Sequence, residues 1–158
     1  MSNKEDNFKE QFKQALLSTA RVISEDYKKD LIKKDKNLSE KKKDLFEITN
    51  LSSKNDFIKL RAEVDSNALK KRFSDTKIFN RNLPNNPSSK SLYNLAEKIR
   101  YEMLGTKIFE GIKKNLTENY NQKIQVTRKD QFKSKDDVPL VEAFEPVSYT
   151  HLRAHETR

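Results

Sequence analysis

The sequence has few of the residues that tight turns and sulfur-based sites require: it contains no cysteine, two glycines and four prolines among 158 residues. The lack of cysteine excludes disulfide bonds, thiolate metal sites and cysteine nucleophiles. Two glycines are too few for a glycine-rich phosphate loop, and no Walker, dinucleotide-binding, zinc-protease or serine-hydrolase motif occurs. So few glycines and prolines argue against a many-turned β-sandwich. We therefore expect a mainly α fold, a small helical domain.

Long apolar runs are lacking as well. The chain contains no run of about 18 apolar residues, the length that a membrane-spanning helix needs, and its first residues lack the layout of a signal peptide. Hydrophobic residues make up 34% and charged residues 36% of the chain, and the mean hydropathy is -0.99. We therefore expect a cytoplasmic protein with a lean core, part of whose chain is unpacked, including a flexible C-terminal segment.

Charge is abundant: 33 lysines and arginines oppose 24 acidic residues, for a net charge of +9. Such a balance can attract nucleic acid, an anionic membrane or an acidic protein. Acidic residues interrupt nearly every basic run, however, whereas a nucleic-acid-binding protein is expected to gather its basic residues on one face. The preferred interpretation is an ordinary solvated surface, and a small basic helical nucleic-acid-binding protein is the alternative.

Two amphipathic segments between Asn55 and Leu116 organise the chain, and the helix-breaking sequence Asn-Leu-Pro-Asn-Asn-Pro at 82–87 separates them. Apolar residues recur in both at three- and four-residue spacing, which predicts one apolar face on each helix. The second pattern continues past Gly105 to Leu116. The apolar positions are Phe57, Leu60, Val64, Ala68 and Phe73 in the first segment and Leu92, Leu95, Ala96, Ile99 and Met103 in the second. Because neither helix is stable alone, we predict a helical hairpin or pair.

The flanking sequence predicts three further features. A helix is expected from Phe8 to Ser24, with Asn7 as its N-cap. Apolar doublets at 31–32 and 45–46 within lysine-rich sequence indicate a short β-hairpin. Polar sequence from 121 to 137 predicts a connector. The N-caps of the two central helices are expected at Asn55 or Asp56 and at Pro87-Ser88 or Ser91.

Two motifs in the central stretch carry a family resemblance. Residues 61–69 read RAEVDSNAL, and after the breaker residues 97–105 read EKIRYEMLG, followed by GIKKNL at 111–116. In this order and at this separation they resemble the N-terminal region of the CobT-type subunit of the aerobic, ATP-dependent cobaltochelatase, and the resemblance extends to about Glu145. Where that family often has histidine, this chain has Phe73 and Phe79 or Asn80, so no imidazole metal site is expected in this region.

The resemblance implies a truncated subunit of a ligase that forms metal–nitrogen bonds. The whole complex would insert Co2+ into hydrogenobyrinic acid a,c-diamide during cobalamin biosynthesis, using ATP and Mg2+. The implied partners are an AAA+ ATPase subunit and a large catalytic subunit. We expect this N-terminal fragment to be an assembly and interaction module without a catalytic, cofactor-binding or metal site of its own, and we expect neither membrane nor nucleic acid as a partner.

Charged residues at fixed positions of the matching motifs are candidates for joining the helices or for docking a partner subunit. They are Arg61, Asp65, Asp75, Glu97, Arg100 and Glu102. Spacings of four from Arg61 to Asp65 and of three from Glu97 to Arg100 allow ordinary pairs on one helix face, each worth a few tenths of a kcal/mol. Glu97 and Glu102 lie on different sides of one helix, so the spacing does not predict a catalytic carboxylate pair.

The last dozen residues change from lysine-rich to arginine-rich and hold both histidines of the protein. This string resembles a translated sequencing-adapter fragment, so we interpret it as a non-native tail and assign no metal role to His151 and His155. The predicted organisation is a helical domain over residues 1–120, a connector and the start of a further helix over 121–146, and the tail over 147–158.

Overall fold

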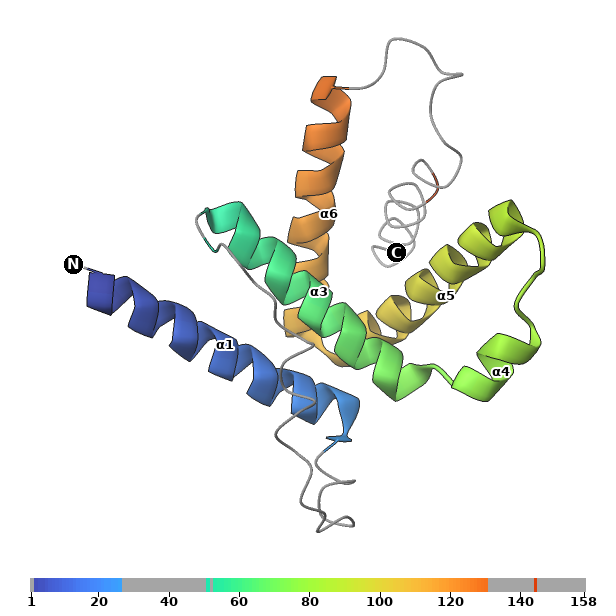
Figure 1. The fold of residues 1–158 in the computed structure, drawn as a ribbon, viewed down its shortest axis with the longest axis horizontal. Coiled ribbons are helices and arrows are strands. Elements are labelled where there is room, and N and C mark those ends of the chain that lie inside the picture. Colours follow the sequence, from blue (N-terminus) through green and yellow to red (C-terminus); the bar gives the residue numbers. More distant parts are fainter. Residues whose placement is uncertain (1, 27–50, 52, 131–143, 145–158) are drawn as a thin grey trace.

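The protein is described by a computed structural model that covers residues 2–26, 51, 53–130 and 144. These residues form the helices α1 (Ser2–Ser24), α3 (Lys54–Phe73), α4 (Thr76–Arg81), α5 (Pro87–Ile108) and α6 (Glu110–Asp130), and no strand (Figure 1). The mainly α prediction is confirmed for this part of the chain. The predicted β-hairpin at 31–32 and 45–46 lies outside the described residues. None of the helices in the described ranges is both long and apolar enough to cross a membrane.

Helix α3 lies at the centre of the fold. It packs against α1, α5 and α6, and α5 and α6 also pack against each other (Figure 1). One buried cluster joins α3 to both later helices and to the end of α1; it includes Leu69, which is fully buried, together with Ile23, Tyr101, Ile112 and Leu116. A second cluster of Leu16, Leu51, Leu60 and Val64 joins α1 to α3. The apolar spacing of the central stretch predicts part of this core, since Leu60, Val64, Ala68, Leu95 and Ile99 are buried. It is wrong at Ala96 and Ile108, which are exposed. Helix α3 also buries more than the single predicted face, because three helices pack against it.

Helices α3 and α5 approach each other closely at Gly105. A methyl group added there would lie 2.3 Å from Cδ2 and 2.5 Å from Cδ1 of Leu69. Only a residue without a side chain fits this contact, because real side-chain atoms do not approach so closely. Gly111, by contrast, faces open space.

The observed helix starts differ from the predicted ones. Asn7 lies within α1, which already begins at Ser2. Ser53 caps α3: its hydroxyl accepts from the Asp56 N–H, and the Asp56 carboxylate accepts from the Ser53 N–H at 2.8 Å. Asn86 caps α5, with Pro87 in the first turn. The expected cap positions were wrong by one to several residues because several polar residues lie near each helix start, and sequence alone does not tell which of them takes the extended conformation of a cap.

The second amphipathic segment is two helices and not one. Phe109 leaves the helical conformation, with φ -121° and ψ 98°, and α6 starts at the next residue. The Phe109 side chain packs against the main core cluster, which holds the bend in place.

Helix α6 then continues to Asp130, through residues where a connector was expected. The remainder of that predicted connector, and the tail at 147–158, lie outside the described residues, so the predicted domain boundaries stay predictions.

Candidate functional site: a polar junction of three helices

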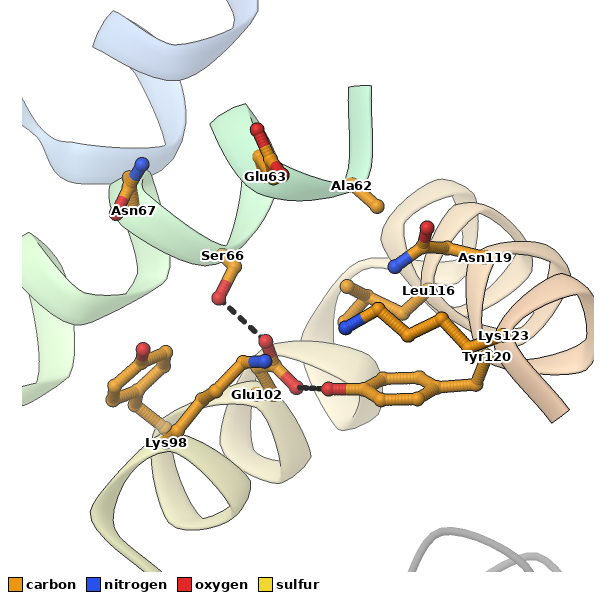
Figure 2. A pocket seen from close by; sticks show the side chains of 11 residues that line it. Ala62, Glu63, Ser66, Asn67, Lys98, Glu102, Leu116, Asn119, Tyr120 and Lys123 are labelled. Atoms are coloured by element: carbon orange, nitrogen blue, oxygen red, sulfur yellow. Dashed lines mark hydrogen bonds between the residues drawn. The ribbon is translucent and has the colours of Figure 1, made fainter. Parts of the chain in front are cut away.

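Glu102 lies at the junction of α3, α5 and α6, and its side chain is almost completely buried, with 1% of the residue exposed. One carboxylate oxygen accepts a hydrogen bond from the Ser66 hydroxyl at 2.5 Å, and the other accepts one from the Tyr120 hydroxyl at 2.9 Å (Figure 2). Removing a carboxylate from water costs several kcal/mol unless hydrogen bonds replace its hydration. The two hydroxyls supply such bonds, so Glu102 joins one residue from each neighbouring helix.

A pocket of about 230 Å3 opens beside this carboxylate (Figure 2). Its walls come from α3, α5 and α6. The polar residues that line it are Glu63, Ser66, Asn67, Lys98, Tyr101, Glu102, Asn119, Tyr120 and Lys123. The ammonium groups of Lys98 and Lys123 lie 5.6 and 5.3 Å from the centre of the Tyr120 ring, within the range of cation–π attraction. Burial raises the pKa of the Tyr101 hydroxyl above its ordinary value.

Asp65 forms a second polar link between helices. It is 2% exposed, and the Asn115 side-chain amide of α6 donates to its carboxylate at 2.8 Å. Burial raises the pKa of Asp65, while the Asn115 hydrogen bond and the positive charge of Arg61 act in the opposite direction. Arg61 itself is exposed. Thus Asp65 lies in the interior, where it contacts another helix, and Arg61 remains at the surface.

Glu97 and Arg100 form an ion pair on α5 that also reaches α3. Their closest atoms are 2.7 Å apart, and Arg100 donates a further hydrogen bond to the carbonyl of Phe73 at 2.6 Å. Glu97 also accepts from the Ser74 hydroxyl at 2.7 Å. The Arg100 hydrogen bond lowers the pKa of Glu97, and Glu97 in turn raises the pKa of Arg100. The pair therefore joins the C-terminal end of α3 to α5, and it gives the Phe73 carbonyl, which has no partner within the helix, a hydrogen-bond donor.

Asp75 serves a local role. Its carboxylate accepts from the backbone N–H groups of Lys77 and Ile78 at 2.8 and 3.2 Å, and so caps α4. Helix α4 is absent from the sequence-based prediction because six residues are too few to show a helical period.

The six candidates therefore do not form one site. Four of them contact a helix other than their own, or the end of one: Asp65, Glu97, Arg100 and Glu102. Asp75 caps a short helix, and Arg61 lies at the surface. A docking role for any of them stays a prediction.

Sequence reasoning missed the partners of the buried carboxylates: Ser66, Asn115 and Tyr120. It also missed the role of Arg72, although this arginine follows the first motif. The Arg72 guanidinium donates to the Ile23 carbonyl at 3.1 Å and pairs with Glu25 at 2.9 Å. It lies 5.4 Å from the ring centres of both Phe73 and Phe109. Its position just after the first motif is the only sequence signal for it, because its contacts to Ile23, Glu25 and Phe109 come from distant parts of the chain.

The junction is polar and well hydrogen-bonded. Every buried side-chain nitrogen and oxygen in the described ranges has a hydrogen-bond partner. The same residues contain no group of three or more acidic or histidine side chains suited to hold a metal ion. The hydrogen bonds of Glu102 and Asp65 fix the three helices relative to one another.

A comparison with protein-family models finds one whose description is "Cobalamin biosynthesis protein CobT", and it matches residues 6–155. All six candidate residues and the partners of the two buried carboxylates fall within this match. No curated protein and no solved structure matches the chain.

Proposed function

Because the chain belongs to the CobT family of cobalamin biosynthesis proteins, we propose that it acts as an assembly module of the aerobic, ATP-dependent cobaltochelatase. In this proposal the chain contributes binding surfaces and no chemistry to the complex that inserts Co2+ into hydrogenobyrinic acid a,c-diamide. Its partners are the AAA+ ATPase subunit and the large catalytic subunit, and the complex works in the cytoplasm with ATP and Mg2+.

The observation that carries the proposal is the family match over residues 6–155. The junction supports it. Hydrogen bonds from Ser66 and Tyr120 to Glu102, and from Asn115 to Asp65, cross-link three helices through buried groups. These hydrogen bonds keep the three helices in a fixed arrangement, and a module that binds partners through its surface needs such a rigid framework.

Nucleic-acid binding receives less support. Several basic residues are already engaged within the protein: Arg72 with Glu25, Lys71 with Asp26, and Arg100 with Glu97. A phosphate backbone that contacted these three cations would have to compete with their carboxylates. Such a binder would also show affinity that falls steeply with salt.

The proposal is tested with the purified ATPase and large catalytic subunits of an aerobic cobaltochelatase. We expect the chain to co-elute with at least one of them in gel filtration, and to show no cobalt insertion by itself. Added in excess to a reconstituted chelatase, it should slow cobalt insertion by competing with the CobT-type subunit of that complex. If it neither co-elutes with a subunit nor competes, the assembly role is wrong.

A further inference from the structure

The segment from Thr76 to Ala96, which we call the arm, contains no aspartate or glutamate, although the chain has 24 of them among 158 residues. Its charged residues are Lys77, Arg81 and Lys90, and all three are exposed. Within the described part of the chain none of them forms an ion pair. Between Asp75 and Glu97, the arm therefore carries three positive charges and no negative charge of its own.

The arm projects from the rest of the molecule. It consists of α4, the loop to Asn86 and the first turns of α5, and Figure 1 shows it extending away from α1 and α6. The backbone of α4 packs against no other described helix. The rings of Phe79 and Tyr93, 5.1 Å apart, join α4 to α5, and the caps at Asp75 and Asn86 fix both helix starts. The arm is thus held by contacts within itself, and no other helix of the described ranges packs against the backbone of α4.

An apolar side chain accompanies the charge. Ile78 on α4 is 54% exposed, next in sequence to Lys77 and one turn from Arg81. A nucleic acid would use the cations but would gain little from an exposed isoleucine. The two aromatic rings of the arm contact each other and do not form an open stacking platform for bases. A protein segment with both carboxylates and apolar side chains would satisfy both kinds of group.

From these observations we infer that the arm is a docking surface for an acidic, partly apolar segment of a partner protein. Carboxylates of the segment pair with Lys77, Arg81 and Lys90, and an apolar side chain covers Ile78. The surface follows from the charge and geometry of the arm; assigning the segment to a chelatase subunit rests on the proposed function.

Two matched pairs of variants test the inference. The first pair neutralises three cations: Lys77→Gln, Arg81→Gln and Lys90→Gln in the arm, against Lys54→Gln, Lys59→Gln and Lys114→Gln at exposed positions outside it. Both triple variants lower the net charge by the same amount. The second pair replaces an exposed apolar residue: Ile78→Ser in the arm against Val22→Ser on α1, where the residues are 54% and 60% exposed. Circular dichroism verifies that all four variants are folded.

The binding probe is a fluorescein-labelled 20-residue peptide of glutamates with a leucine at every fourth position. We expect the arm triple variant to bind it about tenfold more weakly than the unaltered chain, and the control triple variant to change binding less than twofold. Ile78→Ser should weaken binding severalfold and Val22→Ser should not. Binding should also weaken as NaCl is raised, less so for the arm variant.

Equal losses in the two triple variants would show a non-specific charge effect and overturn the inference. Tighter binding of a 20-nucleotide single-stranded oligonucleotide than of the peptide, lost in the arm variant, would also overturn it in favour of nucleic acid. Binding to the purified chelatase subunits distinguishes a failure of this inference from a failure of the proposed function. If the arm variant still binds them as the unaltered chain does, the inference fails and the proposed function stands. If neither protein binds them while the arm still selects the peptide, the proposed function fails and the inference stands.

Discussion

At the scale of single residues, the close contact between α3 and α5 depends on the absence of a side chain at Gly105. We predict that Gly105→Ala destabilises the protein by about 1–3 kcal/mol, because the new methyl group would overlap Leu69 and force this fully buried side chain to shift within the packed core. Urea denaturation measures the free energy of unfolding. Gly111→Ala is the control: it meets no atom within 4 Å, so it should leave stability unchanged or raise it by about 0.5 kcal/mol. Equal losses at the two glycines would contradict the packing argument.

The lowered pKa of Glu97 predicts how the stability of the protein depends on pH. Hydrogen bonding to Arg100 lowers its pKa in the folded protein, below the ordinary value of about 4.3. As the pH falls, the unfolded chain therefore takes up the proton first. The contribution of Glu97 to stability is full at neutral pH, and it is lost as the pH falls through the lowered folded-state pKa. Because the pair is partly exposed, we expect Glu97→Gln to cost only about 0.5–1 kcal/mol at pH 7. The difference from the unaltered protein should vanish in acid, as measured by urea denaturation at several pH values.

Asp65 provides a control of opposite sign. Burial raises its pKa, so the folded protein holds the proton more tightly than the unfolded chain. Its contribution therefore decreases as the pH rises from the unfolded-state pKa, about 3.9, to the raised folded-state pKa. Asp65→Asn should remove this decrease while the Asn115 amide keeps an oxygen to donate to. If both variants shifted the pH profile in the same direction, the assigned environments would be wrong.

At the scale of helices, Arg72 holds the end of α1 in place. Its guanidinium contacts the Ile23 carbonyl, the Glu25 carboxylate and two aromatic rings. Glu25 has φ 57°, a left-handed conformation uncommon for residues other than glycine, and its ion pair helps to compensate the cost. We predict that Arg72→Met destabilises the protein by about 1–3 kcal/mol. Hydrogen exchange should become faster in the last turn of α1 than elsewhere.

The matched control is Lys71→Met. Lys71 is adjacent in sequence and pairs with Asp26 at 3.4 Å, but its side chain is 52% exposed. Its loss should cost less than 0.5 kcal/mol. Arg72→Lys keeps the positive charge but not the planar group that lies over the two rings, so only part of the stability should return. Full recovery with lysine would show that charge alone holds the helix end.

At the scale of the whole molecule, Glu102 couples three helices, so its loss should affect the protein globally. Glu102→Leu removes the buried carboxylate that accepts hydrogen bonds from the Ser66 and Tyr120 hydroxyls, and we predict a loss of about 2–4 kcal/mol. Adding Ser66→Ala and Tyr120→Phe removes the two donors as well and should recover part of that loss. Urea denaturation followed by circular dichroism measures both variants. A triple variant no more stable than Glu102→Leu would argue against the hydrogen-bond network.

The helices themselves were largely predictable from the sequence, because residues such as Leu60, Val64 and Leu95 repeat at the period of a buried helical face. The bend at Phe109 was not. Apolar spacing continues through it from Ile108 to Ile112, so periodicity carries no signal, and the bend depends on packing against distant residues.

The site was predictable only in part. The motifs drew attention to Asp65 and Glu102, but their burial and partners depend on residues 50 and 36 positions away along the chain. Local sequence patterns cannot specify such pairings, since the pairings follow from the way in which the helices pack.

The central position of α3 has a consequence during synthesis. This helix leaves the ribosome before α5 and α6, and its Asp65 can bind Asn115 only after 50 further residues have been synthesised. At about 5–20 residues per second, the interval is about 3–10 seconds. Throughout that time the nascent chain exposes Leu69 and its neighbours, so chaperones and proteases have access to α3 until the later helices cover it.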